Sequence, residues 1–198
     1  MAPKKQVKKQ VKRQMRRPVK AQPKKPVASA AKNAASAGLA REFLAELDAE
    51  LKVTRRCIER VPSERAQWKP HPTSMAMGHL TQLICKMVRV LADIPKGVNL
   101  DLKSGIGYSF EETPALLAEF DANEKNLRAS LAAVKPEDWS KNWSVVAGDH
   151  VLSTSPRKDA MRNTINHFVH HRGQLTVYMR MAGVKIPSLY GPSADENG

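Results

Sequence analysis

Acidic residues are missing from the first 38 positions, although that stretch holds 12 Lys and Arg. The whole chain has 33 basic and 19 acidic residues, which leaves 21 basic against 19 acidic in residues 39–198. The formal charge of +14 therefore resides almost entirely in the N-terminal segment. A nearly neutral remainder is not a strongly basic nucleic-acid-binding domain, so attraction to polyanions is expected of the segment alone.

Several motifs are also absent. No run of 18 apolar residues is present, which excludes a membrane-spanning helix. The two cysteines, Cys57 and Cys85, form no CxxC motif or disulfide framework and are expected to be buried thiols in a reducing compartment. A glycine-rich phosphate loop, a catalytic carboxylate pair and a nucleophile elbow are missing, so nucleotide hydrolysis and serine-hydrolase chemistry have no support. No apolar stretch of the signal-peptide kind follows the basic start, and we expect a cytoplasmic protein.

Residues 1–38 are predicted to be a disordered Lys/Arg-rich tail. Three prolines, at 18, 23 and 26, interrupt any helix, and Ala28–Gly38 has the composition of a small-residue linker. The few apolar side chains cannot form a core. Three interpretations stay open: a clamp for DNA, RNA or anionic lipid, a solvated extension, or a start codon assigned too early.

Residues 39–198 are predicted to form one all-α domain. Apolar residues recur with the helical period in four segments, and a hairpin or ordered loop is expected over 139–155. Because each amphipathic helix must bury its apolar face, a four-helix bundle follows. The predicted helices cover about residues 39–61, 75–94, 114–131 and 157–182, with Thr113 as the cap of the third, Pro114 at its first helical position and Gly183 after the last helix.

The last predicted helix carries the candidate site. His167 and His171 are four residues apart, which places their Cβ atoms about 6 Å apart on one side of a helix. Two imidazoles at this spacing can bind one metal ion, with bonds of about 2.0–2.1 Å. The pattern also occurs in surface or core histidines. His170 is expected to point elsewhere.

Two segments then resemble a known family. The string NHFVHHRGQLTVYMRMAGVKIPSLYGPSADE closely resembles the C-terminal part of the DinB-like family, and WKPHPTSMAMGHL resembles its connection between the first two helices. The resemblance covers residues 39–198 and implies a four-helix bundle that holds a divalent metal, zinc or nickel, by three histidines. It also implies, for some members, a transferase or isomerase reaction with a low-molecular-weight thiol.

The resemblance supplies two of the three ligands. His167 and His171 match the family's HxxxH pair, whereas Leu83 stands where the helix-two histidine is usual. His79, one turn earlier, is the candidate substitute ligand. Alternatively His150 bends over the site, or the site has lost affinity along with the third imidazole. His71 is expected to be a turn or packing residue.

Neighbouring residues have two interpretations each. Arg172 and Gln174 either support the histidines or substrate, or they lie at the surface and against a loop. Gly173 is expected to allow close helix contact. Tyr178 either lines a pocket or packs in the core. Three tryptophans, at positions 68, 139 and 143, are expected to be packing anchors.

The sequence therefore supports two functions. The first is a divalent-metal-binding DinB-like protein, with a thiol-dependent transferase as the reaction and a small molecule or thiol as partner. The second is a non-catalytic bundle that residues 1–38 tether to nucleic acid or another polyanion. The sequence does not determine the oligomeric state, and a homodimer is compatible with it.

Overall fold

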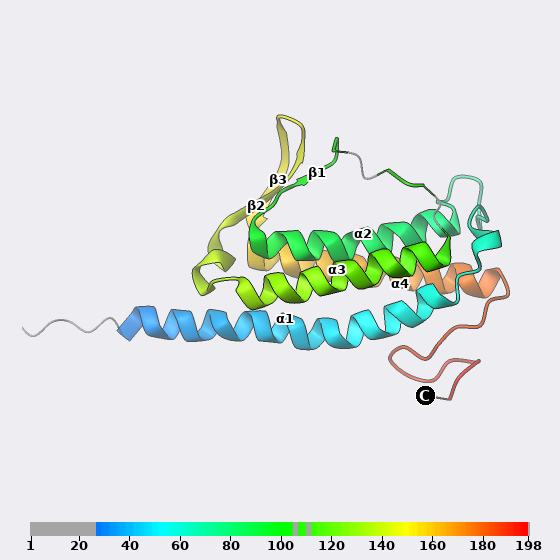
Figure 1. The fold of residues 1–198 in the computed structure, drawn as a ribbon, viewed down its shortest axis with the longest axis horizontal. Coiled ribbons are helices and arrows are strands. Elements are labelled where there is room, and N and C mark those ends of the chain that lie inside the picture. Colours follow the sequence, from blue (N-terminus) through cyan, green and yellow to red (C-terminus); the bar gives the residue numbers. More distant parts are fainter. Residues whose placement is uncertain (1–26, 105–106, 110–111, 198) are drawn as a thin grey trace, which may run out of the picture.

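The structure is a computed structural model that describes residues 27–104, 107–109 and 112–197 (Figure 1). Its four long helices are α1 (Val27–Glu59), α2 (Met77–Lys96), α3 (Thr113–Ala133) and α4 (Arg157–Met181). Helices α1 and α2 both pack against α3 and α4. The predicted all-α four-helix bundle is confirmed.

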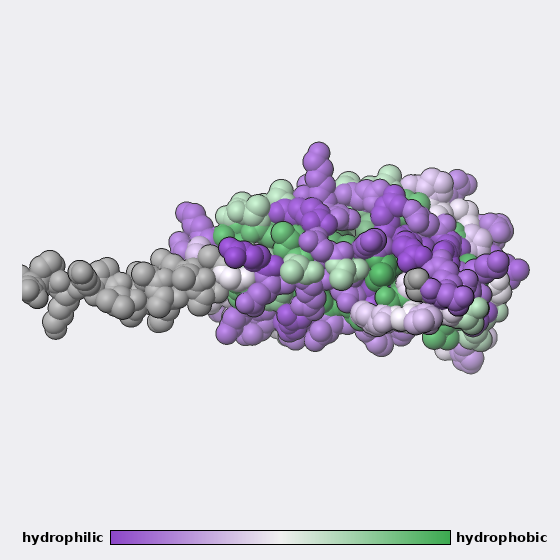
Figure 2. All heavy atoms as spheres, turned by 90° about the horizontal axis from the view of Figure 1, so that it is seen from below, coloured by the Kyte–Doolittle hydropathy of each residue, from purple (hydrophilic) through white to green (hydrophobic). Residues whose placement is uncertain are grey.

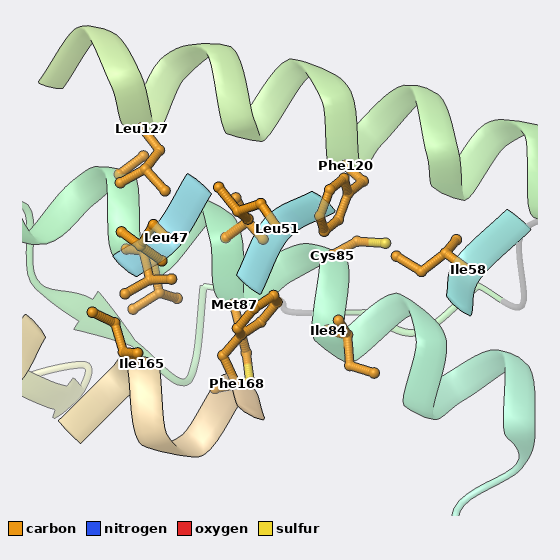
Figure 3. Close-up of a cluster of buried hydrophobic side chains, with 14 of the residues drawn as sticks. Leu47, Leu51, Ile58, Ile84, Cys85, Met87, Phe120, Leu127, Ile165 and Phe168 are labelled. Atoms are coloured by element: carbon orange, nitrogen blue, oxygen red, sulfur yellow. The ribbon is translucent and has the colours of Figure 1, made fainter. Parts of the chain in front are cut away.

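The core lies between the four helices and takes side chains from each of them (Figure 3). Leu47 and Leu51 come from α1, and Phe120 and Phe168 face them from α3 and α4. All four are essentially inaccessible to solvent. Burying such a side chain stabilises a fold by about 1.5–3 kcal/mol, which is why the apolar periodicity predicts this architecture.

Helix α1 begins earlier than the sequence pattern predicts. It starts at Val27, so the linker predicted over 28–38 is instead the first part of this helix. Alanine has the highest helix propensity of any residue, and this stretch is alanine-rich, which outweighs the small-residue resemblance to a linker. The remainder of the predicted tail, residues 1–26, lies outside the described residues.

The start of α3 also differs in detail from the prediction. Thr113 is the first helical residue and does not cap the helix; its cap position is occupied by Glu112. Instead, the Thr113 hydroxyl donates to the Val61 carbonyl oxygen at 2.5 Å, and its amide donates to Ser63 Oγ at 3.0 Å. Thr113 therefore ties the beginning of α3 to the segment that follows α1.

A small three-stranded sheet lies at one end of the bundle (Figure 1). Strands β2 (Asn142–Ala147) and β3 (His150–Pro156) form the predicted hairpin, and β1 (Leu100–Asp101) adds to β2 in parallel. Strand β1 was not predicted. Two single-turn helices, η3 (Ser63–Arg65) and η4 (Pro136–Ser140), complete the described elements.

Two tight features position α2. Gly78 lies so close to η3 that a Cβ there would meet the Ala66 Cβ at 2.9 Å, and its amide donates to the Ala66 carbonyl oxygen at 2.9 Å. At the other end, Gly97 closes the helix in the left-handed conformation, with φ of 79°. The connections before and after α2 are thereby held against the bundle.

The outside of the bundle is mostly polar. Hydrophilic side chains cover most of the face on which α1 lies, and hydrophobic ones show in the gaps between them (Figure 2). Among the described helices, none is long and apolar enough to cross a membrane.

Candidate metal centre

The two histidines of α4 converge as the spacing predicts. The Nε2 atoms of His167 and His171 lie 2.8 Å apart, and the ring centroids are 4.5 Å apart. His171 is buried, with 8% of its surface exposed, whereas His167 is open to solvent. One imidazole of the pair is therefore held in the protein interior, and the other is accessible to solvent.

Gln174 fixes the orientation of the buried imidazole. Its side-chain Oε1 lies 2.7 Å from His171 Nδ1. With that oxygen accepting, Nδ1 carries the proton and His171 Nε2 directs a lone pair at His167. A hydrogen bond of this kind to the outer ring nitrogen is the usual support for a metal-binding histidine. Gln174 therefore supports the histidine pair and does not serve only as a contact to a loop.

The environment favours the neutral form of His167. Burial lowers the pKa of this imidazole below its usual 6.5, and the neighbouring His171 and His170 lower it further. Only the neutral imidazole has a lone pair to offer a metal ion. At neutral pH the exposed member of the pair is accordingly in the form that binds a cation.

A cavity of about 440 Å³ opens beside His167. It lies between α2 and α4, with β1, β2, β3 and Tyr108 completing its walls. Leu83 and Met87 contribute from α2, and Asn163 and Thr164 lie one turn before His167 on α4. A ligand in this space would reach one imidazole of the pair directly.

Leu83 lies in this same cavity, at the position where the resemblance implies a third histidine. His79 is not among the residues that line it; the His79 ring packs on Tyr108, with centroids 3.5 Å apart. Over residues 27–104, 107–109 and 112–197, no three His, Cys, Asp or Glu side chains are grouped so that they could hold a metal. The structure brings together His167 and His171 and does not add His79 to them.

The other three histidines are exposed. His71 lies in the turn before α2, where its Nδ1 pairs with Thr73 Oγ1 at 2.8 Å, in agreement with a turn role. His150 begins β3 at the tip of the hairpin and does not line the cavity. His170 is exposed on α4, with its ring 5.2 Å from that of His171.

Arg172 forms a buried network that the sequence does not predict. It is 1% exposed, so the surface interpretation is wrong. One guanidinium nitrogen donates to Glu50 Oε2 at 2.5 Å, and the other donates to Tyr190 Oη at 2.6 Å. Tyr190 in turn donates to Glu50. The residue next to His171 thus fastens α4 to α1 and to the C-terminal segment (184–197).

The packing shows the roles of two aromatic residues and one glycine for which the sequence makes predictions. Tyr178 lies edge-on against Trp68, with centroids 6.0 Å apart, as a core aromatic would. Trp139 packs against Phe43, and its centroid lies 5.4 Å away. Gly173 has open space above its Cα, so the predicted close helix contact at this glycine is wrong within the described residues.

Trp143 has a double role. It is buried, and its indole nitrogen donates to the Val98 carbonyl oxygen at 2.7 Å, which anchors β2 to the segment after α2. The same side chain forms part of the cavity wall. It is therefore a packing anchor, as predicted, that also shapes the site.

The two cysteines are buried, as predicted. Burial raises the pKa of the Cys57 thiol to about 11 and also raises the pKa of the Cys85 thiol. Neither is a thiolate at neutral pH, so neither supplies a nucleophile to the cavity.

His167 and His171 can supply two ligands to one metal ion. An ion bonded to both Nε2 atoms at about 2.0–2.1 Å would hold them about 3.3 Å apart in a tetrahedral site. The observed separation is 2.8 Å, so a small rotation of either ring accommodates the ion.

Comparison with known proteins agrees with this architecture. The model of the DinB family matches residues 28–197. A DinB-like protein from Bacillus cereus ATCC 10987 superposes with a TM-score of 0.61 at 19% identity, over 75% of this chain and 95% of that one. The DinB-like protein YjoA from Bacillus subtilis gives 0.58 at 21% identity, over 77% and 97%.

A match in sequence covers a shorter stretch. The uncharacterized protein YrdA of Bacillus subtilis strain 168 is 46% identical over 76 residues, which are 38% of this chain. The match spans 45% of the length of YrdA, less than half of that protein. The family model extends over nearly all the described residues and the solved relatives share the bundle. The chain therefore belongs to the DinB family.

Proposed function

We propose that the protein binds a divalent metal ion, zinc or nickel, through His167 and His171, at the wall of the cavity between α2 and α4. The 2.8 Å approach of the two Nε2 atoms is the observation that carries this proposal. The hydrogen bond from His171 to Gln174 and the lowered pKa of His167 support it, because both favour imidazoles with a free lone pair.

The reaction we propose is a thiol-dependent transfer. A bound divalent ion lowers the pKa of a coordinated thiol and makes it a nucleophile at neutral pH. The protein residues have separate tasks. His167 and His171 would hold the ion, Gln174 orients His171, and the aliphatic wall that includes Leu83 excludes water from the second substrate. A cytoplasmic site, where thiols are reduced, suits this chemistry.

Titration of tag-free protein with Zn²⁺ tests the proposal. We expect one site per chain, and at least a tenfold loss of affinity in His171→Ala and in His167→Ala. The matched control is His71→Ala, which removes an exposed imidazole from a turn outside the site. Equal Zn²⁺ affinity in His171→Ala and in the parent protein would overturn the proposal.

A second function has its own supporting observation, the 11 Lys and Arg without any acidic residue in residues 1–26. We propose that this segment tethers the bundle to nucleic acid or another polyanion through contacts that are independent of base sequence. Leu83 in the cavity, in place of a third metal ligand, favours this function over an efficient metalloenzyme.

A further inference from the structure

The size and the lining of the cavity beside His167 indicate what kind of ligand it holds. Its volume of about 440 Å³ falls within the range of small-molecule sites, about 300–1,000 Å³. Much of the wall is apolar, formed by Met87 and Val90 of α2, Leu100 of β1, and Trp143 and Val145 of β2. Such a wall favours a ligand with an aliphatic or aromatic body.

The lining of the cavity also carries a positive charge. Lys86 is the only Lys, Arg, Asp or Glu among the described residues that line the space. Its ammonium group donates to the Gly107 carbonyl oxygen and lies 5.3 Å from the centre of the Tyr108 ring. No carboxylate in the described part of the chain forms an ion pair with it. The ammonium group donates one hydrogen to Gly107, and its other N–H donors can bind a ligand.

The segment that carries Tyr108 is held in place over α2. Gln82 donates to Ser109 Oγ and accepts from the Ser109 amide, both at 2.9 Å. Tyr108 itself packs on His79 and lines the cavity. The phenol and the ammonium group are thus presented together to the cavity by α2 and residues 107–109.

From this arrangement we infer that the cavity binds a small monoanion with an apolar body, such as a medium-chain or aromatic carboxylate, whose charged group pairs with Lys86. The apolar body would lie against Leu100, Trp143 and Val145, and a single positive charge in the described lining favours a ligand with a single negative charge. The inference rests on the proposed function only in that His167 borders the same cavity. Binding of the ligand itself needs no metal.

Isothermal titration of the full-length chain in EDTA tests this inference with three ligands of equal chain length: octanoate, octanol and octylammonium. We expect octanoate to bind at least tenfold more tightly than the other two. In Lys86→Met the preference of octanoate over octanol should fall at least fivefold, because the variant keeps the length of the side chain and removes its charge. The control Arg89→Met removes an exposed charge from α2 that lies outside this cavity, and it should keep the preference.

Two outcomes would overturn the inference: no preference for octanoate in the parent protein, or an unchanged preference in Lys86→Met. Residues 1–26 are the same in all variants, so non-specific attraction of anions to them cancels in the comparison. His171→Ala separates this test from that of the proposed function, since His171 does not line the cavity. It should lose Zn²⁺ binding and retain octanoate binding in EDTA.

Discussion

At the scale of single residues, the site depends on which side chains stand beside His167. Leu83 lines the cavity that His167 borders, whereas His79 packs on Tyr108. Two imidazoles offer an ion fewer bonds than three, so we expect the parent protein to hold its metal weakly.

Leu83→His should raise the affinity for Zn²⁺ at least tenfold, because it places a third imidazole at the cavity wall beside the existing pair. Competition with a chromophoric chelator measures the change, and His79→Ala should leave the affinity of the parent protein unaltered. If Leu83→His changes nothing while His79→Ala abolishes binding, then His79 is the third ligand.

Arg172 makes a separate prediction about stability. Arg172→Met removes the cationic partner of the largely buried Glu50 and leaves it the hydrogen bond from Tyr190, and we expect the free energy of unfolding in urea to fall by about 3 kcal/mol. Arg162→Met, which breaks an exposed ion pair with Glu46, should cost less than about 1 kcal/mol. Equal losses in the two variants would show that burial of the Arg172 pair does not matter.

At the scale of elements, the C-terminal segment is the part held by charge. Glu196 accepts from the Ser188 amide at 2.9 Å and from Arg56 at 2.5 Å, and it also pairs with Arg60. Asp195 pairs with Arg180 of α4 at 2.7 Å. These contacts fasten the segment to α1 and α4 next to Tyr190, which completes the network of Arg172.

The network gives Glu196 a defined pH dependence. The Ser188 amide, together with Arg60 and Arg56, lowers the pKa of this carboxyl from 4.5 to about 2. Because the folded pKa is below the unfolded one, the stabilisation is complete above pH 4.5 and is lost as the pH falls toward 2. The melting temperature of Glu196→Gln should therefore lie below that of the parent protein at pH 6, and the difference should shrink on acidification.

Glu64→Gln, which alters an exposed carboxyl of η3, is the control and should show little difference at either pH. A difference for Glu196→Gln that stays constant from pH 6 to pH 2.5 would contradict the assignment of these contacts to the carboxylate form.

The elements also show how far the sequence could be read. Apolar periodicity predicted α2 and α4 to within two residues of their observed ends, since a helix in a bundle must bury one face. It missed β1, because two residues have no periodicity and Leu100 and Asp101 form a strand only through pairing with β2. The ion pair between Arg172 and Glu50 could not be predicted from the sequence, because the two residues are 122 positions apart in the chain. The histidine pair was predictable from local spacing, whereas the cavity depends on how the sheet covers α2 and α4.

At the scale of the whole molecule, the charge is divided between two parts. Residues 1–26 hold 11 of the 33 basic residues and no acidic one, so residues 27–198 carry 22 basic against 19 acidic. The family match begins at residue 28 and the first helix at Val27. The boundary between basic segment and bundle is therefore better placed before Val27 than at residue 38.

Deletion of residues 1–26 should leave the melting temperature of the bundle within a few degrees, because the core cluster found among the described residues is built from all four helices. The deletion should remove most of the affinity for a short mixed-sequence duplex. In the full chain that affinity should fall steeply with salt, as counterion release requires. Fluorescence anisotropy across a salt series measures the full chain and the truncated protein, and equal affinity in the two would contradict the tether.

X-ray absorption of the Zn²⁺-loaded, tag-free protein shows whether His167 and His171 hold one ion together. We predict two imidazole ligands at about 2.0–2.1 Å in the parent protein, three in Leu83→His, and one at most in His171→Ala. A parent spectrum without imidazole scattering, or one that His171→Ala leaves unchanged, would contradict the claim.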